Sequence, residues 1–408
     1  MKLVIEKIVH GGLGLARDDA GAVLTPFVAA GEEVRGELEP GGKGRRARLV
    51  EVLKPSPARV EPPCPLYGRC GGCQLQHLAY DEQLRAKLDI LLDALARIGG
   101  LTPPEPRLVG APAPLHYRSR VRLHVRRGVA GFIGVRQSEF VPVSRCLLAA
   151  EELNAALPAL PPLLRRERPN EVELCAAPDG VLVKLQEDRL FLWTGPGKTG
   201  EAGKTGAAEF QPVRRPVAFT QVNHAQNEAL RREVAALVDE TGPARVLELY
   251  AGSGNLTAAI ARDGRRIVAL DAESAAVELG RRELAGAPGA VRFLCMPAAE
   301  VSRERRGEDF FPGGGAAEEP ERAADLVLLD PPRAGAREAL AGILRACPRR
   351  IVYVSCDPAT LARDLKELTS PASDDHPRPA YRLSSLILID MFPQTAHLET
   401  VAALDLEQ

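Results

Sequence analysis

The sequence predicts an α/β protein in which a Rossmann-like domain follows a small N-terminal β-barrel and a central α+β domain. Residues 1–57 contain short candidate strands separated by Gly and Pro, a pattern typical of a small barrel. Residues 58–215 combine a helical leucine pattern with an alternating strand. From residue 216 to residue 408 strands and helices alternate, which indicates an open, largely parallel sheet that binds ligands at the carboxyl ends of its strands.

The N-terminal segment has candidate strands at 2–9, 22–28, 32–39 and 46–53. Its start does not read as a signal peptide, because charged side chains interrupt the apolar residues, and no apolar run in the chain is long enough to cross a bilayer. The net charge of −1 predicts no polyanion partner for the chain as a whole, so any basic surface must be local. We therefore expect a monomeric cytoplasmic protein with no membrane partner.

The central region begins with a Gly-rich loop, residues 64–73, that holds three of the eight cysteines. Leucines at helical spacing then predict a helix over 76–98, and Gly99-Gly100 ends it. Two Gly-rich stretches, 194–209 and 306–322, are expected to be flexible insertions. The first contains GKTG twice, but it lacks the preceding strand and following helix of a phosphate-binding loop.

A basic strand follows the helix. Cations alternate with mostly apolar residues from 117 to 126, so period two places the cations on one face of the strand. No Asp or Glu occurs between Glu105 and Glu139, whereas an ordinary solvated face mixes signs. The pattern favours a polyanion-binding face over a solvated one. The predicted RNA-binding residues are Arg118, Arg120, Arg122 and Arg126.

The candidate cofactor site is the strand–turn–helix of residues 244–261. Gly252 and Gly254 let the backbone approach a ligand closely, and the helix that follows offers free N–H groups. Asp271 ends the next strand, 19 residues after Gly252, where a carboxylate can accept both ribose hydroxyls. Thr257 stands where a dinucleotide fingerprint has its third glycine, so S-adenosylmethionine is favoured over a nicotinamide cofactor.

Three further residues occupy strand ends at the same edge. Asp330 opens Asp-Pro-Pro-Arg, in which Arg333 replaces the aromatic residue that amino-group methyltransferases stack on their base. Cys356 ends the next strand as a candidate nucleophile, with a structural cysteine as the alternative. Glu399 is a candidate base, with a surface charge as the alternative. Together they suit methylation at uracil C5, which needs a thiolate at C6, a methyl donor, and a base for the C5 proton.

Nearly the whole chain resembles the RNA (uracil-5-)-methyltransferase family, in the branch with a TRAM domain and an iron–sulfur cluster. The resembling motifs, in family order, are GGLGLAR, PSPARVEPPC, CGGCQLQH, HYRSRVRL, FTQVN, LYAGSGNLT, DPPRAG, YVSCDPATLARDL and DMFPQTAHLETVA. The resemblance implies that Cys356 is the nucleophile and Glu399 the base. It implies cofactor contacts from Gln221, Tyr250, Asn255, Asp271 and Asp330.

The resemblance also implies that the barrel is a TRAM RNA-binding domain and that the helix at 76–98 packs on the distant catalytic domain. It favours 23S rRNA over tRNA as substrate. The chain departs from the family at Asp357, where the family usually has Asn. A negative charge there is expected to raise the pKa of the Cys356 thiol.

Four cysteines outside the catalytic strand form a ligand set, Cys64, Cys70, Cys73 and Cys146. Their spacing alone fits Zn²⁺ and an iron–sulfur cluster equally. The resemblance favours [4Fe-4S]. Three other cysteines sit in apolar sequence and are expected to be inert core: Cys175, Cys295 and Cys347.

Three other functions stay open from the sequence. One is methylation of tRNA uridine. Another is RNA cytosine-5 methylation, although enzymes of that class typically carry a second Cys in the strand-four motif, and DPPRAG has none. The last is a non-catalytic RNA-binding iron–sulfur protein, against which the catalytic and cofactor residues argue.

Overall fold

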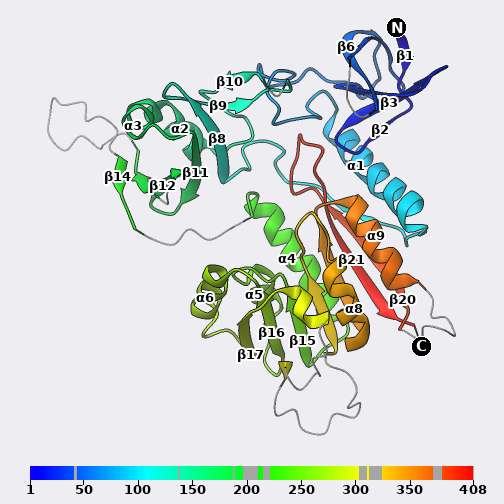
Figure 1. Cartoon of the computed structure of the whole chain (residues 1–408), viewed down its shortest axis with the longest axis vertical. Coiled ribbons are helices and arrows are strands. Elements are labelled where there is room, and N and C mark those ends of the chain that lie inside the picture. Colours follow the sequence, from blue (N-terminus) through cyan, green and yellow to red (C-terminus); the bar gives the residue numbers. More distant parts are fainter. Residues whose placement is uncertain are drawn as a thin grey trace.

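The computed structural model describes residues 1–40, 44–136, 138–186, 189–195, 210–214, 221–302, 310–311, 324–370 and 379–407. They form three sheets that follow one another along the chain, of six, seven and eight strands (Figure 1). Most of the two predicted insertions lies outside the described residues. Among the described helices, none is long and apolar enough to span a membrane.

The first sheet has the strand order β1-β5-β6-β4-β3-β2. Its strands are β1 Lys2–Val4, β2 Lys7–Val9, β3 Leu13–Asp18, β4 Gly21–Pro26, β5 Glu33–Leu38 and β6 Arg45–Lys54. The single strand predicted over 2–9 is two strands, because the chain changes partners: Ile5 N donates to Glu32 O, and Glu6 N donates to Leu15 O. Strand β3 was not among the strands predicted from the sequence.

The second sheet has the order β10-β9-β8-β11-β12-β13-β14. Its strands are β8 Arg120–Arg126, β9 Val129–Ile133, β10 Phe140–Pro142, β11 Glu171–Ala177, β12 Gly180–Lys184, β13 Leu190–Trp193 and β14 Phe210–Pro212. Helices α2 Glu151–Ala156 and α3 Leu160–Glu167 and the 3₁₀ turn Leu157–Ala159 pack their leucines on one face. That packing buries Val121 and Leu123 of β8 and turns the intervening arginines away from the core.

The third sheet has the order β17-β16-β15-β18-β19-β21-β20-β7. Its strands are β7 Arg107–Val109, β15 Arg245–Leu249, β16 Arg266–Asp271, β17 Ala290–Cys295, β18 Leu326–Leu329, β19 Arg350–Ser355, β20 Tyr381–Ile389 and β21 Glu399–Leu406. Neighbours pair in parallel except where β21 lies antiparallel between β19 and β20. This confirms the predicted open, mostly parallel sheet.

Helices cover both faces of this sheet. On one face lie α4 His224–Asp239 and α5 Asn255–Ile260. On the other lie α1 Tyr80–Ala94, α8 Arg337–Ala346 and α9 Pro358–Thr369. Helix α6 Ser274–Glu283 packs on β17, and a 3₁₀ turn spans Ala298–Ser302.

Two segments that precede the second sheet in the sequence pack with the third sheet, one as a helix on its face and one as a strand at its edge. Helix α1 lies beside α9 and buries Ile90 and Leu91 in the same core (Figure 1). Strand β7 adds to the edge by pairing in parallel with β20. The division at residue 58 and residue 216 therefore describes the sequence order, whereas α1 and β7 pack with the C-terminal sheet.

Candidate active site

The nucleophile and base predicted from sequence are neighbours across two strands. Ser355, the last residue of β19, is the register partner of Thr400 near the start of β21. Cys356 follows Ser355 and Glu399 precedes Thr400, so both lie at the edge where β15, β16 and β18 also end, close enough for the Glu399 charge to act on the Cys356 thiol. Antiparallel pairing thus brings together two residues 43 positions apart in the sequence.

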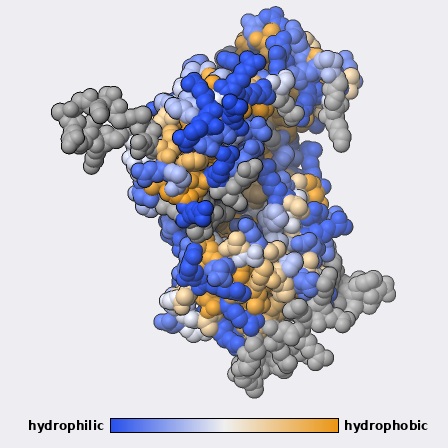
Figure 2. All heavy atoms as spheres, turned by 60° about the vertical axis from the view of Figure 1, so that its left-hand side comes forward, coloured by the Kyte–Doolittle hydropathy of each residue, from blue (hydrophilic) through white to orange (hydrophobic). Residues whose placement is uncertain are grey.

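A cavity of about 980 Å³ opens at this edge. The cavity lies between the second and the third sheet. The space-filling view shows a recess there, between the upper and lower parts of the molecule (Figure 2). Its volume is at the upper end of the range for small-molecule sites. All seven predicted cofactor residues line it: Gln221, Tyr250, Gly252, Gly254, Asn255, Asp271 and Asp330.

The glycine turn is held in a shape that only glycine tolerates at its second position. Gly254 has φ +93°, and a Cβ there would lie 2.7 Å from Leu284 and 2.8 Å from Phe293. Gly252 N donates to Asp271 Oδ2 at 2.7 Å, so β16 and the turn are tied together. The Asn255 side chain exchanges hydrogen bonds with Asn227 of α4. The turn is therefore prearranged for a ligand.

Glu248, to which the sequence patterns assigned no role, holds the helix that follows the same turn through a hydrogen bond. Its buried carboxylate accepts a hydrogen bond from Thr257 Oγ1 at 2.7 Å, and burial raises its pKa to about 8. Thr257, the residue that replaces the third glycine, therefore ties the start of α5 to β15. A carboxylic residue within an otherwise apolar strand was the available signal.

Cys356 is half-buried, and its thiol is held largely protonated in the free protein. Burial raises its pKa to about 11, with the nearby Glu399 carboxylate as the second cause. Arg333 opposes this shift by its charge and its hydrogen bond to the thiol. The sequence predicted that Asp357 would raise this pKa, but Asp357 is not among the groups that shift it. Its Oδ1 accepts from Ala359 N and Thr360 N and caps α9.

The carboxyl group of buried Glu399 lies near that of Asp330, which is half-buried at the cavity wall. Burial and then the neighbouring Asp330 raise the pKa of Glu399 well above its ordinary value, while Arg333 opposes the shift. Burial raises the pKa of Asp330 to about 7. Because two neighbouring negative charges disfavour double ionisation, each carboxylate is a stronger base than an exposed one.

Arg333 and His397 are further residues of the site to which the sequence assigned no role. Arg333 Nη2 donates to His397 Nδ1 at 3.4 Å. Burial, and then the Arg333 charge, lowers the pKa of His397 to about 4, so the ring is neutral and accepts. The His397 ring packs edge-on against Phe392 with centroids 5.8 Å apart. The arginine in the Asp-Pro-Pro-Arg motif was the signal for this arrangement.

Raising the pH is expected to increase alkylation of Cys356 about tenfold per unit between pH 7 and pH 10, since the thiolate fraction grows tenfold per unit below a pKa of about 11. Peptide mass spectrometry after iodoacetamide treatment measures the rate, with total labelling of the exposed Cys295 as the reagent control. Arg333→Gln should slow Cys356 labelling at each pH, because it removes the cation that favours the thiolate. A plateau below pH 9 would contradict the assignment.

The basic strand is less uniform than its sequence indicated. In β8, Arg120, Arg122 and Arg126 lie on one face as predicted, and the first two line the large cavity. Glu173 of β11 lies 3.4 Å from Arg122 and 3.8 Å from Arg120. Glu171 pairs with His124 at 3.3 Å. The local sequence has no acidic residue here, but the neighbouring strand β11 adds two to this face.

The other two predicted RNA-binding arginines have aromatic contacts. Arg118 precedes β8, and its guanidinium carbon lies 5.9 Å from the Phe392 ring centroid, in the active-site loop, residues 390–398, that leads to Glu399. Arg126 lies 5.2 Å from the Phe140 ring centroid. Arg118 is thus directed toward the active-site side, whereas Arg126 covers the outer part of the second sheet.

The four cysteines of the predicted ligand set line one cavity of about 200 Å³. Burial raises the pKa of Cys73 to about 12 and also raises that of Cys70, and the other cysteines add to both shifts. Among the residues that the structure describes, no three or more His, Cys, Asp or Glu side chains converge tightly enough to hold a metal ion. The thiols surround a space and do not meet at a point.

The remaining cysteines differ from expectation in one case. Cys175 is buried and Cys347 half-buried, but Cys295 is exposed, so its assignment to the core is wrong. Cys295 is the last residue of β17, the edge strand of the third sheet, and the side chain of an edge strand has no neighbouring strand to cover it on the outer side.

Comparisons with known proteins agree with this geometry. Residues 209–406 match the family described as tRNA (Uracil-5-)-methyltransferase. A 23S rRNA (uracil(1939)-C(5))-methyltransferase of Pseudomonas entomophila is 34% identical, over 98% of this chain and 92% of its own. An uncharacterized RNA methyltransferase of Aquifex aeolicus is 32% identical, over 100% and 99%.

One solved structure covers 99% of both chains, with a TM-score of 0.70 and 26% sequence identity. It is the tRNA (uracil-54, C5)-methyltransferase of Pyrococcus abyssi in complex with S-adenosyl-L-homocysteine. The similarity extends over all three sheets.

Proposed function

Because the chain belongs to the RNA uracil-C5 methyltransferase family, we propose that it transfers a methyl group from S-adenosyl-L-methionine to C5 of a uridine in 23S rRNA. The observation that carries the proposal is the pairing of β19 with β21, which sets Cys356 beside Glu399. Both lie near Asp330, which together with the glycine turn lines the large cavity. Nucleophile, base and donor site thus share one sheet edge.

The residues of the cavity suit the cofactor. Asp271 sits at the end of β16 with Oδ2 on Gly252 N, the position from which a carboxylate accepts ribose hydroxyls. The turn and the start of α5 offer N–H groups, and Asp330 lies on the side of Cys356. When bound there, S-adenosyl-L-methionine supplies an electrophilic methyl group.

The chemistry of the chain's own residues then follows. The Cys356 thiolate adds to uracil C6, and the electron pair displaced from the C5–C6 double bond makes C5 nucleophilic. C5 takes the methyl group and still carries its proton. Glu399 removes that proton, the C5–C6 double bond re-forms, and the Cys356 sulfur leaves as thiolate. Arg333 lowers the pKa of the thiol that must ionise at the start.

Loss of 5-methyluridine from RNA of a deletion strain is expected, and nucleoside mass spectrometry of separated rRNA and tRNA tests it. The relatives that are named as 23S rRNA enzymes favour rRNA as the substrate of this chain, whereas the similar Pyrococcus enzyme is named as a tRNA methyltransferase. Restoration by the wild-type gene but not by a Cys356→Ala gene is the control. A lost 5-methylcytidine would instead support a cytosine enzyme, and unchanged RNA would refute the proposal.

We further propose that RNA lies across β8 and the first sheet. Arg120 and Arg122 line the same cavity as the cofactor turn. The β2–β3 turn of the barrel approaches the active-site loop closely, since a Cβ on Gly12 would lie 3.0 Å from Gln74 and 3.1 Å from Ala396. This contact supports a TRAM-like RNA-binding role for residues 1–57.

Replacing both Arg120 and Arg122 with Ala should weaken RNA binding and reduce its salt dependence by about two counterions, with unchanged affinity for S-adenosyl-L-methionine. The matched variant Glu173→Gln removes the carboxylate that pairs with both arginines, so it should tighten RNA binding and steepen the salt slope. Filter binding over a salt series measures both. Equal slopes in all three proteins would mean that these arginines face no phosphate.

The four-cysteine cavity supports a [4Fe-4S] cluster, which we propose as the second cofactor. Its donor set is four thiols, which are typical cluster ligands. All four thiols line one cavity of about 200 Å³, and the resemblance to the family branch with a cluster favours [4Fe-4S] over Zn²⁺. Methyl transfer moves no net electrons, so the role of these cysteines is to hold the segment 64–78 in place.

A further inference from the structure

We propose that Lys87, buried in helix α1, is a positioning residue that sets the geometry of Glu399 through the segment 390–398. The inference rests on the proposed function of Glu399 as the base. Segment 390–398 joins β20 to β21, and Glu399 is its next residue. Ile389, directly before the segment, is the register partner of Glu399. A shift of this segment therefore reaches the carboxylate directly.

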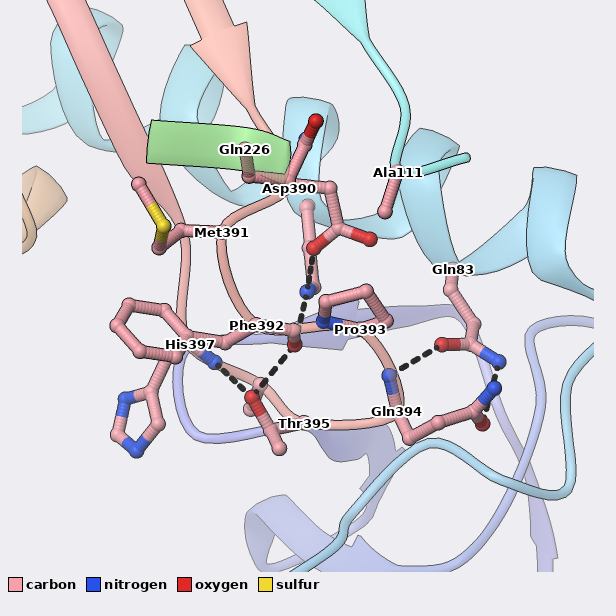
Figure 3. Close-up of polar contacts among 12 residues, drawn as sticks. Gln83, Ala111, Gln226, Asp390, Met391, Phe392, Pro393, Gln394, Thr395 and His397 are labelled. Atoms are coloured by element: carbon pink, nitrogen blue, oxygen red, sulfur yellow. Dashed lines mark hydrogen bonds and ion pairs between the residues drawn. The ribbon is translucent and has the colours of Figure 1, made fainter. Parts of the chain in front are cut away.

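Lys87 binds the segment near its start, at Asp390 and Phe392. Its Nζ donates to Asp390 Oδ1 at 2.5 Å and to Phe392 O at 3.0 Å, and both charged side chains are fully buried. Figure 3 labels Asp390 and Phe392 and marks these contacts with dashed lines. One side chain thus fixes two points of the segment, one through a charge and one through the main chain. It comes from a helix more than 300 residues away in the sequence.

Asp390 is itself held from three sides. Its other oxygen, Oδ2, accepts from Tyr80 Oη at 2.8 Å, and Tyr80 Oη accepts from Ala111 N at 2.6 Å. Its main-chain N donates to Val109 O at 2.9 Å, at the end of β7. The ion pair therefore joins α1 and the β7 edge to the start of the segment.

Gln83, one turn before Lys87 on α1, grips the second part. Its amide accepts from Gln394 N and donates to Gln394 Oε1, both at 3.0 Å (Figure 3). Gln394 has φ +67°, a left-handed conformation that is strained for a residue other than glycine. Its carbonyl accepts from Gln74 N and Leu75 N, next to the cysteine loop. The strained turn thus persists because its neighbours fix it.

Stability alone does not explain a buried ion pair here. Desolvating two charges costs several kcal/mol, and an apolar pair of similar volume is often as stable or more so. What the charged pair adds is one defined geometry, since either charge without the other is strongly disfavoured in a dry site. The geometry that it defines is that of the loop before the base.

The test is the double variant Lys87→Met with Asp390→Leu, which removes both charges and leaves neither unpaired. Its melting temperature should equal or exceed that of the wild type. Methyl transfer in a single turnover should stay within about threefold, whereas release of methylated RNA from the covalent adduct should slow about 100-fold, because misplacement by about 1 Å costs this much. Labelled adduct should accumulate on a denaturing gel.

Three controls make the result specific. Arg85→Ala, which removes an exposed ion pair on the same helix, should change neither step. In a Glu399→Gln background the double variant should not alter methyl transfer further, since Lys87 acts through Glu399. Tyr80→Phe removes one hydrogen bond to Asp390, so it should slow the same release step about threefold and gives the answer if the double variant does not fold.

Wild-type methylation with trapping by Glu399→Gln, measured alongside, establishes the proposed function independently. If those controls behave as expected and the double variant and Tyr80→Phe both release RNA at the wild-type rate, Lys87 has no positioning role. Equal slowing of methyl transfer and release would also overturn it, because a general structural defect does not select one step. If the wild type forms no methylated RNA, the proposed function itself has failed.

Discussion

Glu399→Gln is expected to yield a protein–RNA adduct that survives denaturing electrophoresis and carries the transferred methyl group. Thiolate addition and methyl transfer come before proton removal, so a variant without the base completes both and stops. The structure supports this division, because Glu399 is buried beside Cys356 and its pKa is raised by burial and by Asp330. Turnover should fall by at least about 1000-fold.

Cys356→Ala is the matched variant and should form neither adduct nor product, because without the thiolate C5 never becomes nucleophilic. The combination with Glu399→Gln should behave as Cys356→Ala alone. Mixing each protein with RNA and methyl-labelled cofactor, followed by a denaturing gel, reads out all three. A labelled adduct that persists without Cys356 would show that another group is the nucleophile. Normal turnover by Glu399→Gln would show that Glu399 is not the base and has only a structural role.

Cys73→Ser is expected to lose most of its iron and to loosen the loop before the base. The wild type, purified without oxygen, should contain about four irons per chain. Cys73 directly precedes Gln74, whose side chain accepts from Ala396 N and whose N–H, with that of Leu75, donates to Gln394 O. Losing the ligand should therefore raise hydrogen exchange over 390–398, measured by mass spectrometry, and lower activity.

Cys295→Ser is the control for this experiment. Cys295 is exposed on β17 of the third sheet, whereas Cys73 lies in the loop before α1, so replacing Cys295 should leave iron content and hydrogen exchange unchanged. Stoichiometric zinc with no iron in the wild type would refute the cluster. Unchanged exchange over 390–398 after iron loss would show that the cysteine loop holds its shape without the cluster.

Local sequence patterns determine much of this protein. The strand–turn–helix around Gly252 and Gly254 is predictable because turn chemistry is set by a few adjacent residues. The sheet that carries Cys356 is predictable because buried strands alternate with amphipathic helices over short distances. Sequence motifs predict the cofactor residues, and all seven of them lie around one cavity.

Prediction failed where the deciding contact joins distant parts of the chain. Glu173 lies beside Arg120 and Arg122 only because β11 pairs with β8, and the two strands are too far apart in the sequence for a local charge pattern to show it. Cys295 is exposed because β17 is the edge strand, which depends on the order of the whole sheet.

Lys87 shows the same limit most clearly. In sequence it is a charged residue within an amphipathic helix, and its full burial appears only when α1 packs beside α9 and meets Asp390. A residue's helical or strand tendency depends on its neighbours in the chain, so the sequence alone determined the elements and the chemistry at their ends. Burial, charge pairing and pKa depend on neighbours in space, and for Lys87, Glu173 and Glu399 only the tertiary structure decided them.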